Sequence, residues 1–158
     1  MKPRIDLTRV SPKAVQAMYG LTIYVNESGL DHRLLELVKM RTSQLNGCAY
    51  CIDMHSKDAR VAGETEQRLY LLDAWRETGL YSERERAALE WTEALTRIGE
   101  GHVPDSVYAA AREHFSEQEL VSLSLAVVST NGWNRLAIAF RAEAGTYRPG
   151  MHEVRRTA

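Results

Sequence analysis

The sequence lacks the features that mark secreted, membrane-spanning or nucleic-acid-binding proteins. Its 158 residues include two cysteines and four prolines, and 20 Lys and Arg stand against 21 Asp and Glu, which gives a net charge of −1. The basic residues are spread along the chain, which argues against binding to a nucleic acid or an anionic membrane. The most apolar stretch, residues 120–140, is too polar for a membrane span because it contains Ser122, Ser124, Asn131, Asn134 and Arg135.

The N-terminus also lacks a secretory signal. It reads Met-Lys-Pro-Arg-Ile-Asp-Leu, without the apolar run that follows the basic residues of a signal peptide. We therefore expect a cytoplasmic protein. Both cysteines lie in one tetrapeptide, Cys48-Ala49-Tyr50-Cys51. In a reducing compartment, such a pair is redox-active or metal-binding more often than it is a structural disulfide.

Length and composition predict a single globular domain over residues 1–158. No alternating stretch of five or more residues is bounded by hairpin turn residues, so no strand is expected. Helix start and stop signals recur instead. They predict a compact all-α domain of about six to seven helices, with a loose tail from about residue 145.

The first predicted helices are defined by proline, glycine and an apolar stripe. Ser11-Pro12 has the form of an N-cap followed by proline at the first helical position, and Gly20 is expected to close that helix. Residues 31–45 carry apolar side chains at helical spacing. The helix that holds the cysteines is expected at about residues 48–62, with Gly63 as its left-handed cap.

A further helix is expected from Glu64 to Gly79, and two capping boxes start the later ones. Ser82 and Ser116 each stand three residues before a glutamate, which is the spacing of a capping box. The helix after Ser116 is apolar on more than one side. This pattern predicts burial against both its own domain and a neighbouring subunit, and therefore a homo-oligomer.

Cys48, Cys51 and His55 are three, four and seven residues apart, so on one helix they share a face. At a helix N-terminus, unpaired N–H groups and the dipole lower the pKa of a thiol below its reference value of about 8.5. His55 lies one turn beyond Cys51, where it can take or return that thiol's proton. Such a dithiol can attack a disulfide or a peroxide, because one thiolate is the nucleophile and the other resolves the adduct into an intramolecular disulfide.

The cysteine pair has three other interpretations. Buried cysteines often behave as small apolar residues, so an inert pair stays open. A structural zinc site needs four ligands, and after Cys48, Cys51 and His55 there is no fourth cysteine and the other histidines are scattered. A thioredoxin-type domain needs a βαβ context that this sequence does not provide. We therefore expect no metal site at the cysteine pair.

Glu36, twelve residues before Cys48, is a further candidate that periodicity does not favour. On the helical wheel it lies beside Met40 and Ser43, away from the apolar stripe, which is typical of a solvent-exposed glutamate. Glu36 could face the cysteines only if its helix were buried on both sides.

The spacing of these residues resembles the signature of the alkylhydroperoxidase D-like (AhpD-like) proteins of the carboxymuconolactone decarboxylase superfamily. That signature is Glu36, eleven residues, Cys48-x-x-Cys51, three residues and His55. Neighbouring segments resemble the family too, and the likeness covers most of the chain. They are residues 36–51, Ala59-Arg60, residues 85–89 and Asn131-Gly132-Trp133-Asn134-Arg135-Leu136.

The resemblance implies an all-helical subunit that assembles into trimers and commonly hexamers, with peroxidase or disulfide-reductase activity without haem, flavin or metal. It implies that Cys51 attacks the peroxide, that Cys48 resolves the adduct, and that Glu36 and His55 form a proton relay through water. The helix dipole, by contrast, should acidify Cys48 at least as much as Cys51. Tyr50 also departs from members that carry a histidine between the cysteines.

The favoured hypothesis is a cofactor-free, peroxiredoxin-like oxidoreductase: a dithiol-dependent alkyl hydroperoxide reductase that takes electrons from an external dithiol or lipoyl-type reductant. A carboxymuconolactone decarboxylase-type enzyme is an alternative, although those relatives do without the cysteine pair. A non-catalytic helical oligomer whose dithiol senses redox state is another alternative, and turnover with peroxide separates it from the first.

Overall fold

The protein is built from helices alone in the part that the structure, a computed structural model, describes: residues 2–152. This confirms the predicted all-α fold. The helices outnumber the expected six to seven because two single turns, α1 and α7, are present and the helix expected from Glu64 to Gly79 is divided into α5 and η1. The elements are α1 (Leu7–Val10), α2 (Pro12–Asn26), α3 (His32–Asn46), α4 (Ala49–Val61), α5 (Glu66–Leu71), the 3-10 helix η1 (Leu72–Glu77), α6 (Glu83–Thr96), α7 (Ile98–Gly101), α8 (Asp105–His114) and α9 (Glu117–Phe140).

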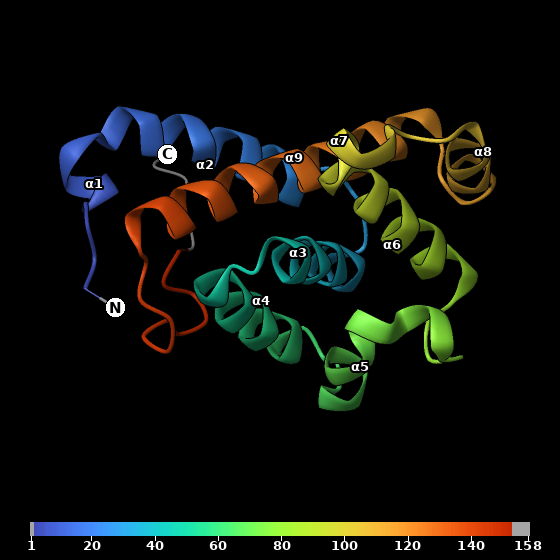
Figure 1. Ribbon diagram of the computed structural model, residues 1–158, viewed down its shortest axis with the longest axis horizontal. Helices are drawn as coiled ribbons and strands as arrows, with labels where there is room; N and C mark the ends of the chain where they lie inside the picture. Colours follow the sequence, from blue (N-terminus) through green and yellow to red (C-terminus); the bar gives the residue numbers. More distant parts are fainter. Residues whose placement is uncertain (1, 153–158) are drawn as a thin grey trace.

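Helix α3 lies at the centre of the molecule, with α9 on one side, α4 on another and α6 beside it (Figure 1). Its residues from Leu34 to Ser43 are all buried. Leu35 and Val38 belong to the core shared with α6, α8 and α9, whereas Leu37 and Met40 belong to the core shared with α5 and η1. Because α3 packs on several sides, its polar side chains also face the interior.

Several helix ends match the sequence signals. Ser82 and Ser116 form complete capping boxes, in which the serine side chain accepts from the N3 backbone and the N3 glutamate accepts from the serine backbone. Gly47 and Gly63 take positive φ values of 66° and 91° after α3 and α4, where glycine is favoured. The cysteine helix, expected at about residues 48–62, spans Ala49–Val61.

The expectation that Gly20 closes α2 is wrong, because α2 continues to Asn26. A glycine inside a helix costs about 1 kcal/mol relative to alanine, and packing can offset that amount. Helix α2 lies along α9, and a Cβ at Gly132 would be 2.8 Å from Cε of Met18. Tertiary packing of α2 on α9 therefore overrides the local stop signal.

Helix α9 also exposes apolar side chains, which is the pattern behind the expected oligomer. Val121, Val128 and Ile138 are exposed, while Leu123 and Val127 lie in the core. Among residues 2–152, no helix combines the length and apolar character needed to cross a bilayer.

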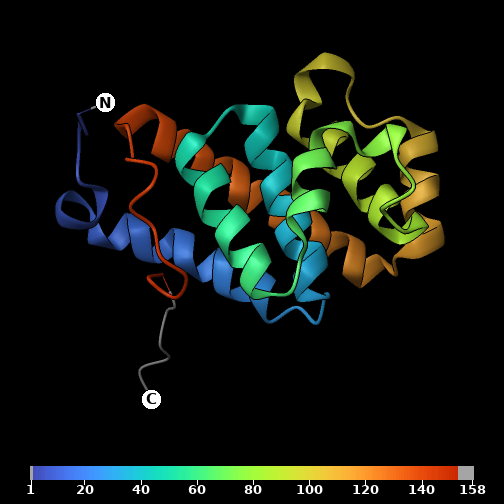
Figure 2. The ribbon, with the colours of Figure 1, turned by 90° about the horizontal axis from the view of Figure 1, so that it is seen from below.

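The tail expected to be loose from about residue 145 is packed against the molecule in its described part. Figure 2 shows this segment running from the end of α9 across to α2, beside α4. The N–H of Gly145 donates to Asp53 (3.0 Å), and Lys57 donates to the carbonyl of Tyr147 (3.1 Å). Tyr147 is buried. These contacts join residues about ninety positions apart, so no local pattern reveals them; residues 153–158 lie outside the described part.

Candidate functional site

The two cysteines meet at the start of α4. Cys48 is the N-cap residue of that helix and Cys51 lies in its first turn. Both are free thiols and both are buried. Cys48 Sγ and Cys51 Sγ lie 2.6 Å apart and form a thiol–thiol hydrogen bond. A disulfide bond is about 2.05 Å long, so the two sulfurs need little movement to bond.

The two thiols differ in pKa because of their surroundings. The hydrogen bond from Cys51 lowers the pKa of Cys48 to about 7, although burial opposes this, and the N–H groups of Cys51 and Tyr50 contribute in the same direction. The same hydrogen bond, together with burial, raises the pKa of Cys51. In the reduced pair, Cys48 is therefore the more acidic thiol, as the helix dipole suggested.

Glu36 faces His55, contrary to the helical-wheel argument. His55 Nδ1 and Glu36 Oε2 are 3.1 Å apart, and Lys39 donates to Glu36 Oε1 across 2.9 Å. Burial by itself would raise the pKa of Glu36, but the hydrogen bond and charge of His55 and those of Lys39 lower it to about 2. Periodicity was misleading here because α3 is buried on its polar side as well.

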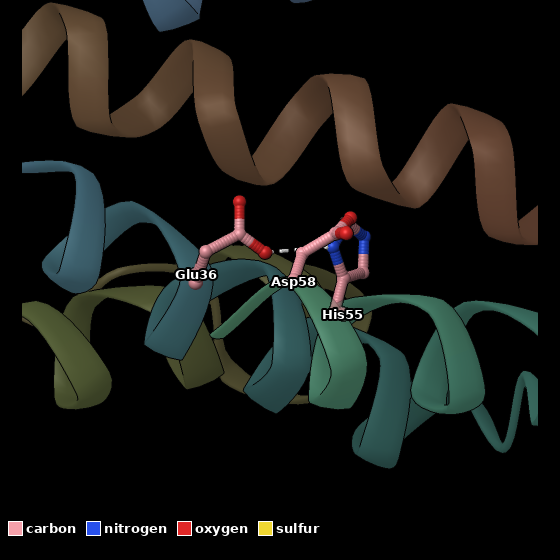
Figure 3. Close-up of side chains that lie close together, drawn as sticks. All are labelled: Glu36, His55 and Asp58. Atoms are coloured by element: carbon pink, nitrogen blue, oxygen red, sulfur yellow. Dashed lines mark hydrogen bonds and ion pairs between the residues drawn. The ribbon is translucent and has the colours of Figure 1, made fainter. Parts of the chain in front are cut away.

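Asp58 joins Glu36 and His55 as a third member of the cluster. Figure 3 shows the three side chains turned toward one another, with Glu36 coming from α3 and the other two from α4. One ligand atom of each lies within 4.8 Å of the other two. Tyr147 donates to Asp58 (2.8 Å to Oδ1). Burial raises the pKa of Asp58, and the Tyr147 hydrogen bond opposes that rise.

These three side chains could hold a metal ion. Histidine nitrogen and carboxylate oxygen are common ligands of zinc and other transition metals. These ligands differ from those considered for a zinc site at the cysteine pair, because Cys48 and Cys51 are not among them. Lys39, already bound to Glu36, adds a positive charge that a cation would have to overcome.

A cavity of about 850 Å³ opens beside this cluster. Cys51, His55, Glu36 and Asp58 line it, whereas Cys48 does not. Cys51 is therefore the sulfur that a small molecule in the cavity would meet. The arrangement places a cavity-lining thiol, a second thiol in contact with it and a carboxylate–imidazole pair around one space.

Some residues of the site were not found from the sequence. Asp58 lies one turn beyond His55, so helical spacing could have suggested it. Asn134 stood out in the sequence only as a polar residue of an apolar stretch and as part of a family-like segment; it is fully buried, and its side chain opposes the rise in the pKa of Cys51. Lys39 and Tyr147 carried no distinguishing signal, because their roles depend on contacts between distant segments.

Comparisons with known proteins identify the family of the chain. A family model for the carboxymuconolactone decarboxylase family matches residues 11–94. The uncharacterized protein YdfG of Bacillus subtilis is 43% identical over 146 residues, which make up 92% of this chain and 99% of YdfG. YnjA of Escherichia coli, also uncharacterized, is 35% identical over 98 residues, which make up 61% of this chain and 53% of YnjA.

Solved structures share the fold. A protein of unknown function from Agrobacterium tumefaciens, described as a candidate antioxidant defence protein AhpD, matches with a TM-score of 0.89 at 43% identity and covers 92% of this chain and 100% of its own. A peroxidase-related protein from Ralstonia eutropha, described as an AhpD core, matches in fold with a TM-score of 0.77 at 19% identity over 89% of this chain and 74% of its own. The chain belongs to the carboxymuconolactone decarboxylase family, as an AhpD-like member.

Proposed function

We propose that the protein is a dithiol peroxidase that reduces organic hydroperoxides and is returned to its reduced form by an external dithiol or lipoyl-type reductant. The observation that carries the proposal is the position of Cys51, which lines the cavity while its sulfur contacts that of Cys48. Glu36 and His55 stand on the same cavity as a hydrogen-bonded pair.

The reaction proceeds in three steps. The Cys51 thiolate attacks the terminal oxygen of the hydroperoxide; the O–O bond breaks, Cys51 becomes a sulfenic acid, and the departing alkoxide takes up a proton to give the alcohol. Cys48 then attacks the Cys51 sulfur and displaces hydroxide, which leaves as water once protonated, and a disulfide remains. The external dithiol exchanges with that disulfide and becomes oxidised in its place.

The two cysteines suit different steps. Cys51 reaches the substrate because it lines the cavity, and its proton must leave before it attacks. Cys48 has a pKa lowered to about 7 in the reduced pair, mainly by the hydrogen bond with Cys51. Its sulfur contacts that of Cys51, so it is placed to attack the oxidised Cys51 in the resolving step.

His55 is the group placed to carry the proton. It lies one turn beyond Cys51 on α4, and its Nδ1 lies 3.1 Å from Glu36. In the tautomer that donates from Nδ1, the carboxylate orients the ring and leaves Nε2 as the basic nitrogen. The imidazole then accepts the thiol proton and returns it to the leaving alkoxide. Glu36→Gln should slow turnover at least about tenfold, because general acid–base groups typically contribute about 10²–10⁴-fold.

The test is peroxide consumption with dihydrolipoamide as the electron donor. Wild type should turn over repeatedly, and Cys51→Ser should lose the reaction. Without the electron donor, Cys48→Ser should consume about one equivalent of peroxide and stop, with a sulfenic acid on Cys51 that dimedone traps. Retained turnover in Cys51→Ser contradicts the proposal. A wild type that forms the Cys48–Cys51 disulfide but never turns over supports the redox-sensing alternative, and release of carbon dioxide from a carboxymuconolactone supports the decarboxylase.

A further inference from the structure

The cavity is far larger than the smallest peroxide requires. Its volume of about 850 Å³ falls within the range of about 300–1,000 Å³ typical of sites for drug-sized molecules. Hydrogen peroxide needs little more room than a water molecule, whose share of liquid volume is about 30 Å³. Much of the wall is hydrocarbon or aromatic. It includes Val15, Ile23, Met54, Trp133 and Leu136.

The charged groups of the cavity disfavour an anion. Among the described lining residues, Lys39 is the one lysine or arginine, whereas three carboxylates line the cavity: Glu27, Glu36 and Asp58. Lys39 is already bound to Glu36 and to the side-chain oxygen of Asn26 (3.1 Å). A substrate carboxylate would therefore give up its hydration without gaining a free lysine or arginine partner.

The end of the chain completes the wall beside the dithiol. Tyr147 and His152 line the cavity, and their rings stack with centroids 5.4 Å apart. His152 Nε2 lies 2.7 Å from the hydroxyl of Tyr50, the residue next to Cys51, and its Nδ1 lies 3.2 Å from the hydroxyl of Tyr19 on α2. One imidazole thus links the cysteine helix to the opposite wall.

From these observations we propose that Tyr147 and His152 are specificity-determining residues, which hold the apolar part of a neutral organic hydroperoxide against the wall beside Cys51. The inference rests on the peroxidase function proposed above. It excludes hydrogen peroxide and carboxylate-bearing hydroperoxides as preferred substrates. Aryl or branched alkyl hydroperoxides fit the aromatic wall, where the Tyr19 and Trp133 rings lie 5.2 Å apart.

The first experiment measures binding without turnover. The probe is 2-phenyl-2-propanol, the alcohol formed from cumene hydroperoxide, and the readout is the fluorescence of Trp133, the tryptophan that lines the cavity. We expect a saturable change in wild type, none in Trp133→Phe, and at least tenfold weaker binding of the ring-carboxylated alcohol. His152→Ala should weaken binding at least fivefold, whereas His114→Ala, on α8 away from the cavity, should not.

The second experiment compares kcat/KM for cumene hydroperoxide, its ring-carboxylated analogue and hydrogen peroxide. We expect the neutral aryl hydroperoxide to be preferred over each of the others at least tenfold, and His152→Ala and Tyr147→Ala to reduce the preference over hydrogen peroxide at least fivefold. Equal or tighter binding of the carboxylated alcohol, or unchanged preferences in both variants, overturns the inference even if peroxides are reduced. Binding with the expected preferences and no reduction of any peroxide supports the ligand class and overturns the proposed function instead.

Discussion

The buried carboxylate of Glu36 should make the stability of the protein depend on acid in a way that one substitution removes. Its pKa falls from the ordinary 4.5 to about 2, because the hydrogen bonds and charges of His55 and Lys39 outweigh burial. A depressed pKa contributes stability above the unfolded-state value, and that stability is lost as the pH falls toward the folded-state value. At about 1.4 kcal/mol per pKa unit, Glu36 contributes about 3 kcal/mol at neutral pH, of which about 2 kcal/mol is lost by about pH 3.

The assay is chemical denaturation followed by circular dichroism from pH 7 to pH 3, at fixed protein concentration with the thiols reduced. Glu36→Gln should be less stable at pH 7 by about 3 kcal/mol, the order found for breaking one side of a buried ion pair. Its curve should approach that of wild type as the pH falls. Glu66→Gln is the matched control, because Glu66 pairs with Arg60 at the surface and should follow wild type. If the free energies of unfolding of wild type and Glu36→Gln change in parallel from pH 7 to pH 3, the reasoning is refuted.

Four other outcomes are expected. Thiolate absorbance should titrate near pH 7 in reduced wild type and move upward in Cys51→Ala, where Cys48 loses its hydrogen-bond donor; an unmoved midpoint would assign the acidic thiol elsewhere. Ser116→Ala should cost about 1 kcal/mol in the free energy of unfolding by removing the cap of α9, and no measurable loss would mean that the box contributes nothing. Mn²⁺ should inhibit peroxide turnover by occupying the carboxylate–imidazole cluster, and Asp58→Asn should relieve the inhibition while Asp53→Asn should not; equal inhibition in both variants argues against the site. Sedimentation should give a multiple of three subunits, as the resemblance implies for a chain whose α9 exposes apolar side chains, and single subunits at micromolar concentration would contradict this.

The sequence was sufficient wherever the deciding interactions are local. The capping boxes at Ser82 and Ser116 act within four residues, and the contact between Cys48 and Cys51 follows from a spacing of three at a helix start. Such features depend little on the rest of the fold, so the helical class and the dithiol could both be predicted.

The remaining features depend on what packs around each helix. Glu36 lies on the polar side of α3, and other helices cover that side as well. Its burial therefore follows from the central position of α3 in the folded domain. The contact between Tyr147 and Asp58 spans 89 residues, and the stop signal at Gly20 is overridden by packing along α9. Family resemblance placed Glu36 in the site where periodicity did not, because the resemblance carries information about the whole fold.

The position of Cys48 at the N-cap has a consequence for the helix itself. The Cys48 side chain makes no cap hydrogen bond to α4, but the N–H groups of Cys51 and Tyr50 in the first turn lower the pKa of its thiol, and so favour the thiolate. Oxidation to a disulfide removes the negative charge that those N–H groups favour. Oxidation of the pair therefore also alters the end of a helix: the first turn of α4 should be held more firmly in the reduced protein, and its amide hydrogens should exchange faster once the disulfide has formed.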